Sequence, residues 1–210
     1  YMGYARQDKR FLQGEPVSAR AVAQVLSRGV LEIITVNIHE KEVLKYFGVP
    51  ARNISLARDI GSYIKSLHLS NPLILAPDEG ALNFAEHVAS AGGWDVDHLE
   101  KTRLSGVEVK MAPKQICAAS RSVVIVDDII STGGTIATAS GMLYQQGAKE
   151  VFAACVHGVL TGGAYVHLMT AGIRDVVCSD TIERGCSKIS AAGRIAQTIK
   201  NADSNDTKNE

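Results

Sequence analysis

The sequence predicts an α/β fold in which a parallel sheet is flanked by helices. Short runs of β-branched and aliphatic residues lack polar alternation, and such runs are typical of parallel strands that are buried on both faces. Segments between these runs carry apolar residues three and four positions apart, which is the pattern of helices that pack on a sheet. The two kinds of segment alternate along the chain, and this order favours parallel strands connected by helices.

Each element is placed by one of these two patterns. The apolar runs of strand length lie at 30–36, 73–76, 122–126, 151–156 and 175–178. The segments with helical periodicity lie at 18–26, 57–67, 80–91, 134–146 and 163–171. Because ligands of open parallel sheets bind beyond the carboxyl ends of the strands, we expect functional residues there.

The chain is expected to contain more than one domain. A junction near residues 53–57 divides residues 1–56, interpreted as the C-terminal portion of an incomplete N-terminal α/β domain, from a second domain at 57–200. The polar stretch 201–210 is expected to be a disordered tail. The chain begins Tyr1-Met2-Gly3 without an initiator methionine, so we expect further residues upstream.

Composition excludes several classes of protein. With 46% hydrophobic and 21% charged residues, the chain has the balance of an ordinary globular protein. Basic and acidic side chains number 22 each, so no overall charge favours nucleic acid or a membrane surface as partner, and any anion site must be local. Neither a signal pattern nor a run of roughly 18 apolar residues is present, and the cysteine spacing fits a reducing compartment, so we expect a cytoplasmic protein.

The most informative segment runs from a strand through two acids and a small-residue loop into a helix. Asp127 and Asp128 end an apolar strand, where carboxylates require hydroxyl groups, cations or a metal to bind. The loop that follows offers hydroxyls and unobstructed backbone N–H groups at a helix start, a favourable place for an anion, in Ser131, Thr132, Gly133, Gly134 and Thr135. Together these groups suit a sugar monophosphate. A strand-to-helix turn with an acidic N-cap would explain one Asp and one Gly, but not the whole cluster.

Residues 127–135 resemble the 5-phosphoribosyl-1-diphosphate signature shared by type I phosphoribosyltransferases and ribose-phosphate diphosphokinases. The resemblance implies a phosphoribosyltransferase-like (type I) fold preceded by a related first domain. It also implies that Asp127 and Asp128 bind the ribose hydroxyls, and that residues 131–135 bind the 5-phosphate.

Three further segments favour the diphosphokinase branch. Residues 3–10 and 14–19 resemble its ATP-contacting segment, which has no counterpart in the transferases and implies ATP contacts by Arg6 and Gln7. Read alone, Arg6 could form a surface salt bridge. His39 and Asp78 match the family's magnesium-linked residues, although by themselves they would be a structural histidine and a helix cap. Asn37 departs from the aspartate common two residues before that histidine.

Residues 100–110 resemble the catalytic flexible loop of the same family. Lys101 and Arg103 would act on the migrating phosphates, and Arg103 would also contact ribose 5-phosphate. A solvated hairpin is the simpler interpretation. The reaction implied is attack of the 1-hydroxyl of ribose 5-phosphate on the β-phosphorus of ATP, with Mg²⁺ as cofactor and AMP as the second product.

Two alternatives stay open at this stage. A phosphoribosyltransferase would use the same sugar site with a nucleobase in place of ATP. A non-catalytic regulatory homologue would bind and modulate an active enzyme, an idea that Asn37 supports and the presence of Lys101 and Arg103 opposes. The resemblance also implies a homo-oligomer of two or more copies and an ATP site that residues upstream of Tyr1 help to complete, so the chain as given is expected to lack part of that site.

Overall fold

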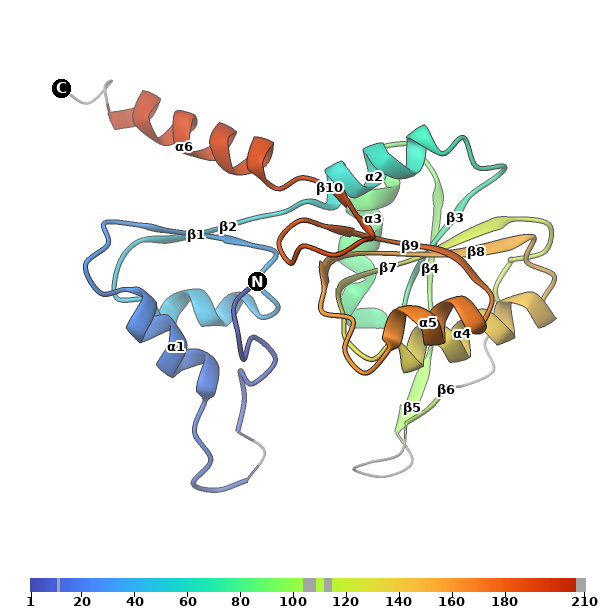
Figure 1. Cartoon of the computed structure of the whole chain (residues 1–210), viewed down its shortest axis with the longest axis horizontal. Coiled ribbons are helices and arrows are strands. Elements are labelled where there is room, and N and C mark those ends of the chain that lie inside the picture. The colour runs from blue at the N-terminus through green and yellow to red at the C-terminus, as the bar shows by residue number, and fades with distance from the viewer. Residues whose placement is uncertain (11, 104–108, 112–114, 207–210) are drawn as a thin grey trace. The chain divides into compact units, whose positions relative to one another are not determined.

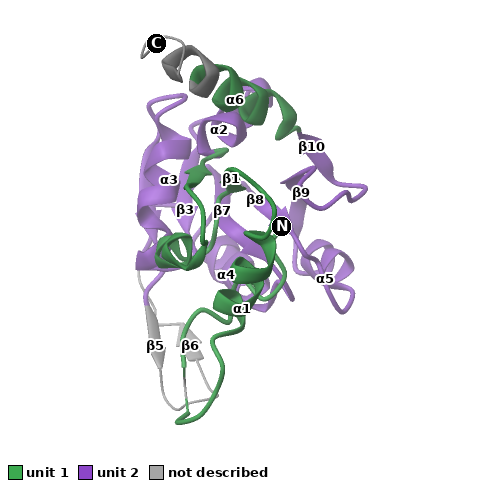
Figure 2. Ribbon diagram, turned by 90° about the vertical axis from the view of Figure 1, so that its left-hand side faces the viewer, with its two compact units in different colours: residues 1–56, 190–210 green, residues 57–189 purple. Residues whose placement is uncertain are grey.

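The structure is a computed structural model that describes residues 1–10, 12–103, 109–111 and 115–206, with side chains described outside 101–114 and 202–206. The chain divides into two compact units, which are coloured separately in Figure 2. Unit 1 comprises Tyr1–Leu56 with Ser190–Glu210, and unit 2 comprises Ala57–Ile189. Within the described residues, no helix has the length and hydropathy needed to cross a bilayer.

Unit 2 is built on a six-stranded sheet with the strand order β10-β9-β8-β7-β3-β4. All neighbouring strands in this sheet pair in parallel. The strands are β3 (Leu73–Ala76), β4 (Asp95–His98), β7 (Ser122–Ile130), β8 (Glu150–Gly158), β9 (Ile173–Ser179) and β10 (Ser187–Ile189). Their carboxyl ends therefore share one edge of the sheet.

Helices cover both faces of this sheet, as the sequence predicted (Figure 1). Helices α2 (Ala57–Ser66) and α3 (Leu82–Ala89), the latter preceded by the short η2 (Glu79–Ala81), lie on one face. Helices α4 (Gly134–Gln145) and α5 (Ala164–Thr170) lie on the other. A fully buried cluster joins the sheet to these two helices through Ile125, Val151, Leu143 of α4 and Leu168 of α5. Burial of each such side chain contributes about 1.5–3 kcal/mol to the stability of the fold.

A separate antiparallel ribbon joins β4 to β7 in the chain. It consists of β5 (Lys101–Arg103) and β6 (Val109–Met111), with Lys101 opposite Met111 and Arg103 opposite Val109.

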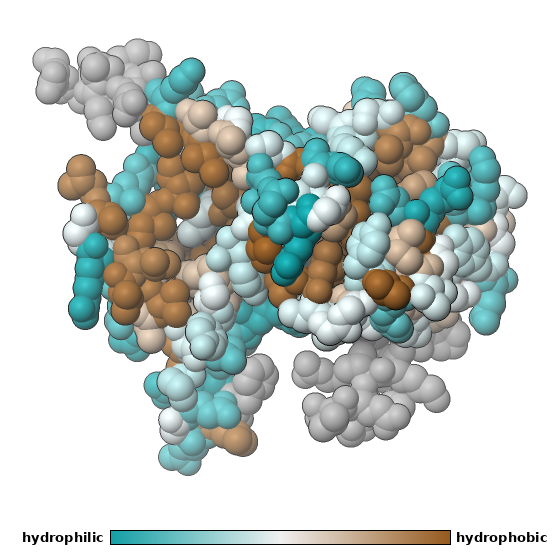
Figure 3. Space-filling view, viewed as in Figure 1, coloured by the Kyte–Doolittle hydropathy of each residue, from teal (hydrophilic) through white to brown (hydrophobic). Residues whose placement is uncertain are grey.

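Unit 1 contains a parallel pair of strands, β1 (Ile33–Val36) and β2 (Ala51–Ile54), with helix α1 (Ser18–Leu26) and the short η1 (Lys41–Tyr46). Its small core includes Ala19 and Ala23 of α1 with Val43 and Phe47. Large apolar side chains are also exposed on this unit, among them Val25 (62%), Leu26 (50%) and Leu31 (94%). Figure 3 shows a large brown, hydrophobic area on the same unit.

The chain after β10 forms helix α6 (Ala192–Asp206). The sequence predicted a disordered tail from residue 201, and the structure differs from this expectation up to residue 206. Extending a helix that has already nucleated costs little, and the segment Asn201–Asp206 contains neither proline nor glycine to stop it. Residues 207–210 lie outside the described part.

Candidate active site

Three acidic residues lie at the carboxyl edge of the sheet in unit 2. Asp127 and Asp128 follow five fully buried residues of β7, and Asp78 follows the neighbouring strand β3. The Asp128 N–H donates to Oδ1 of Asp127 at 2.9 Å. Oδ1 of Asp78 accepts from the Ala81 N–H at 3.2 Å, so Asp78 does cap a short helix. The three side chains are all half-buried.

The environment of Asp127 favours its neutral form. Burial raises the pKa of Asp127 well above its usual value, and the charge of Asp128, a carboxyl–carboxyl hydrogen bond with Asp128 and the charge of Asp78 raise it further. The backbone N–H of Asp128 acts in the opposite direction. Because like charges crowd this edge, a ligand that brings a cation or hydroxyl donors is stabilised there.

The phosphate loop, residues 131–135, connects β7 to the N-terminus of α4. Gly133 is the N-cap of this helix with φ 75°, and no side chain forms a capping hydrogen bond there among the described residues. A Cβ on Gly133 would lie 2.9 Å from Cγ of Leu168, so the position requires glycine for its space as well as its backbone angle. Thr132, Gly134 and Thr135 are exposed. The loop thus presents backbone N–H groups and hydroxyls to solvent at the positive end of a helix.

A second loop, residues 159–163 between β8 and α5, supports the phosphate loop. The Leu160 N–H donates to the Ile130 carbonyl at 3.0 Å, and the Thr161 N–H donates to the Ser131 carbonyl at 3.1 Å. The hydroxyls of Ser131 and Thr161 are 3.4 Å apart. The sequence patterns above predict no role for this loop, although one signal is present, because Thr161-Gly162-Gly163 repeats the letters of Thr132-Gly133-Gly134.

Three residues of unit 1 are expected to bind ATP or the metal, and all three lie outside its helices and strands. Arg6 and Gln7 have exposed side chains, and the Gln7 carbonyl accepts from the Ala19 N–H of α1 at 3.1 Å. His39 is exposed and follows β1. Since Asp78, Asp127 and Asp128 belong to unit 2, the contribution of Arg6, Gln7 and His39 to one common site stays a prediction.

Asn37, the position that departs from the family pattern, has a structural role. It is buried and has φ 40°. Its Oδ1 accepts from the Leu56 N–H at 2.8 Å, and its own N–H donates to the Ile54 carbonyl at 2.8 Å. The Asn37 amide therefore connects the chain after β1 to the chain after β2.

The expected catalytic cations are described only in part. Lys101 and Arg103 lie on β5, two positions apart, and their side chains lie outside the described residues. Their roles stay a prediction.

The acids suit the metal that the resemblance implies. Among the described residues, no group of three or more His, Cys, Asp or Glu is arranged to hold a metal ion by itself. Mg²⁺ prefers oxygen ligands and is commonly held by one or two carboxylates together with substrate phosphates. Half-buried carboxylates such as Asp78 fit this kind of shared site better than a closed protein cage.

Comparisons with known proteins agree with this geometry. A family model described as the phosphoribosyl transferase domain matches residues 50–167. The fold and the phosphate loop therefore define a protein of the phosphoribosyl transferase class.

Similarity over nearly the whole chain is more specific. The chain is 50% identical over 199 residues to a ribose-phosphate pyrophosphokinase of Methanosarcina mazei, covering 95% of this chain and 67% of that protein. It is 46% identical over 202 residues to the one of Methanopyrus kandleri, covering 96% and 69%. The crystal structure of phosphoribosylpyrophosphate synthetase from Mycobacterium smegmatis matches 98% of this chain and 70% of that chain, with a TM-score of 0.81 and 30% identity. The chain belongs to the ribose-phosphate pyrophosphokinase family.

Proposed function

We propose that this protein transfers the diphosphate group of ATP to the 1-hydroxyl of ribose 5-phosphate, which gives 5-phosphoribosyl 1-diphosphate and AMP. The proposal rests on the continuous segment formed by β7, the phosphate loop and α4. It places, on one short stretch of chain, a pair of carboxylates and a helix N-terminus that no described side chain caps. Membership of the family supports the same reaction.

The sugar phosphate is held at both ends. The backbone N–H groups and hydroxyls of residues 131–135 bind the 5-phosphate, where the partial positive charge of α4 favours an anion. Asp127 and Asp128 accept hydrogen bonds from the ribose hydroxyls, and these donors offset the like charge that raises the pKa of Asp127.

The chemistry is a single displacement at phosphorus. The 1-hydroxyl oxygen forms a bond to the β-phosphorus, the bond between the β-phosphorus and the oxygen bridging to the α-phosphate breaks, AMP departs with that oxygen, and the hydroxyl proton passes to solvent. Lys101 and Arg103 stabilise the negative charge that shifts between oxygens during this step. Arg6 and Gln7 bind ATP. Asp78 and His39 would hold Mg²⁺ together with phosphate oxygens, and the bound ion would neutralise charge on the ATP phosphates.

The proposed location and oligomeric state are supported by the cysteines and by the exposed apolar side chains. All four cysteines are free, which supports a location in the reducing cytoplasm. The exposed apolar side chains of unit 1, of which Leu31 is 94% exposed, support assembly into a homo-oligomer of two or more copies.

A product assay tests the proposal. The protein is incubated with ATP, ribose 5-phosphate and Mg²⁺, and AMP is measured with the Asp128→Asn and Asp95→Asn variants in parallel. Asp95 is a matched control, because it lies at the amino end of β4, pairs with Arg121 at 2.8 Å and has a side chain that is 72% exposed.

We expect AMP from the wild type and from Asp95→Asn, and little from Asp128→Asn. Release of diphosphate that depends on a nucleobase would instead indicate a phosphoribosyltransferase. Binding of both ribose 5-phosphate and ATP without any turnover would favour a regulatory homologue.

A further inference from the structure

Arg184 lies in the turn between β9 and β10 and reaches across to the end of β8. Its Nε donates to the Gly158 carbonyl at 3.1 Å, and its Nη2 donates to the Val159 carbonyl at 2.8 Å. A guanidinium carries its donors in a rigid plane, so two bonds to consecutive carbonyls fix the orientation of both peptide groups. These carbonyls belong to the last residue of β8 and to the first residue of the loop that supports the phosphate loop.

The peptide group between Val159 and Leu160 connects Arg184 to the phosphate loop. Its carbonyl accepts from Arg184, and its N–H donates to the Ile130 carbonyl at 3.0 Å. The next N–H, that of Thr161, donates to the Ser131 carbonyl at 3.1 Å. A charged donor on the carbonyl polarises the peptide and strengthens the hydrogen bond that its N–H donates.

The backbone at Leu160 needs support of this kind. Leu160 has φ 46°, a left-handed conformation that is unfavourable for a residue with a side chain. The hydrogen bonds from Arg184 hold the two residues before it. The Leu160 N–H bond to Ile130 holds the residue itself.

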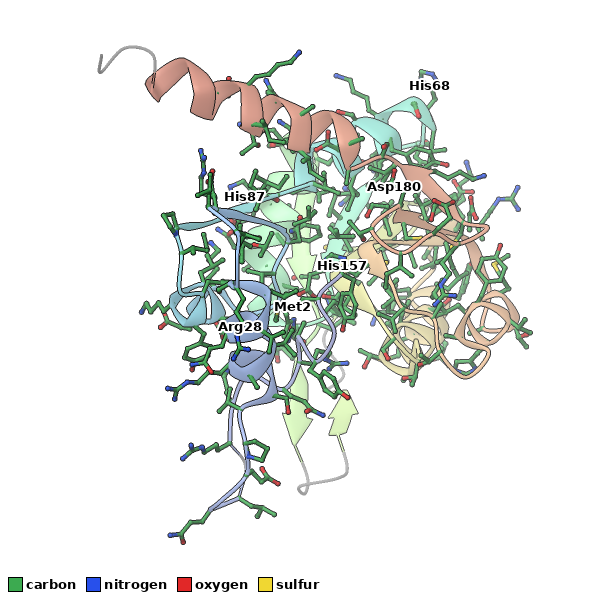
Figure 4. The ribbon with its side chains drawn as sticks, turned by 60° about the vertical axis from the view of Figure 1, so that its left-hand side comes forward. Met2, Arg28, His68, His87, His157 and Asp180 are labelled. Carbon is green, nitrogen blue, oxygen red and sulfur yellow. The ribbon has the colours of Figure 1, made fainter. Side chains whose placement is uncertain are left out.

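The turn that carries Arg184 is itself held in place. The Arg184 N–H donates to Ser187 Oγ at 3.0 Å, and Ser187 N–H donates back to the Arg184 carbonyl at 3.0 Å. Upstream in the same turn, Thr181 Oγ1 lies 2.8 Å from Nδ1 of the buried His157, which is labelled in Figure 4. These hydrogen bonds therefore restrain the backbone conformation of the turn from which the exposed Arg184 side chain extends.

From these contacts we infer that Arg184 is a positioning residue for the 5-phosphate site, acting through the Val159–Leu160 peptide on the phosphate loop. In this role Arg184 acts through the backbone of the two loops and not by contact with substrate. The inference deepens the proposed function and rests on it, because the loop is taken to bind the phosphate of ribose 5-phosphate.

Calorimetric titration with ribose 5-phosphate tests the inference. The proteins compared are the wild type, Arg184→Ala, Arg184→Lys and Arg174→Ala. Arg174 is a matched control, since it lies near the amino end of β9, where its guanidinium is 3.6 Å from Glu150 and its side chain is 70% exposed. Apparent KM values for ribose 5-phosphate and for ATP are measured on the same proteins.

Loss of a charged donor from these two carbonyls should weaken binding of ribose 5-phosphate about tenfold in Arg184→Ala. Arg184→Lys should recover part of the affinity, because one ammonium can reach one carbonyl, and Arg174→Ala should match the wild type. The KM for ATP should not change. A general loss of structure would not be partly reversed by Arg184→Lys, and it would raise the KM of both substrates. A positioning role predicts partial recovery and a change for ribose 5-phosphate alone.

Equal affinity of the wild type and Arg184→Ala would overturn the inference and leave the proposed function intact. A parallel rise in the KM of both substrates would also overturn it. If Arg184→Ala does not fold, Arg184→Lys decides the matter, with wild-type affinity counting against the inference. Failure of the wild type to bind ribose 5-phosphate would overturn the inference and the proposed function together.

Discussion

Replacing Gly133 by alanine should damage the phosphate loop, whereas a methyl group added at Gly134 or Gly141 of α4 meets nothing within 4 Å. The new Cβ would lie 2.9 Å from Cγ and 3.0 Å from Cδ2 of Leu168, in a residue with φ 75°. A left-handed angle costs an L-residue about 1–2 kcal/mol. Overpacking against a buried leucine costs typically about 1–3 kcal/mol. Together the two costs are about 2–5 kcal/mol. They reduce the free energy of unfolding and the free energy with which the phosphate loop binds its ligand.

Urea unfolding and titration with ribose 5-phosphate measure the two parts of this loss. Gly141→Ala on the same helix is the matched control, because nothing lies within 4 Å of its added Cβ. That change should raise the free energy of unfolding by about 0.5–1 kcal/mol, since alanine is favoured over glycine inside a helix. The additional change Leu168→Ala should relieve the steric part in Gly133→Ala, but not the part due to φ. If Gly133→Ala unfolds and binds like the wild type, the account of this loop is wrong.

Four other changes test separate parts of the structure. Because burial and like charges raise the pKa of Asp127, the folded state binds a proton more tightly than the unfolded state, and this contribution to stability is lost as pH rises through the folded pKa. Asp127→Asn should therefore melt at a higher temperature than the wild type at pH 7 while losing activity. The difference in melting temperature should become smaller toward pH 4, and a difference that does not change with pH would contradict the raised pKa of Asp127. Arg121→Ala should lower the free energy of unfolding by about 1–3 kcal/mol in urea, because its guanidinium donates to the Asn71 and Pro72 carbonyls, and affinity for ribose 5-phosphate should stay unchanged. Lys101→Ala should abolish AMP formation and leave calorimetric binding of ribose 5-phosphate intact; undiminished turnover would remove its assigned role. Chelation of Mg²⁺ should stop AMP formation and added Mg²⁺ should restore it, whereas turnover in excess chelator would exclude the shared metal site.

Apolar periodicity located the elements that carry the site. The predicted strand at 73–76 and helix at 18–26 have the bounds of β3 and α1. The strand predicted at 122–126 extends through Ile130 in the structure, because β8 pairs with it as far as Gly158. The acids therefore lie within the last residues of a strand, and the order of acids, loop and helix remains the one that the sequence indicated.

Polar edge strands and distant contacts could not be predicted in this way. The strands β4 and β10 lie at the two edges of the sheet, and their sequences, DVDH and SKI, carry few apolar residues. An edge strand has one paired side and needs less apolar surface, so periodicity gives little signal. Arg184 contacts a carbonyl 26 residues away in the sequence, which no local pattern reveals.

The central claim is that one strand, its two acids and the phosphate loop bind a five-carbon sugar phosphate at both ends. The most direct measurement is a calorimetric comparison of ribose 5-phosphate, ribose and inorganic phosphate as ligands of the wild type and of Asp128→Asn. Ribose 5-phosphate should bind more tightly than either of its parts, and Asp128→Asn should reduce this advantage while inorganic phosphate binds as before. Equal affinity for inorganic phosphate and ribose 5-phosphate in the wild type would contradict the claim.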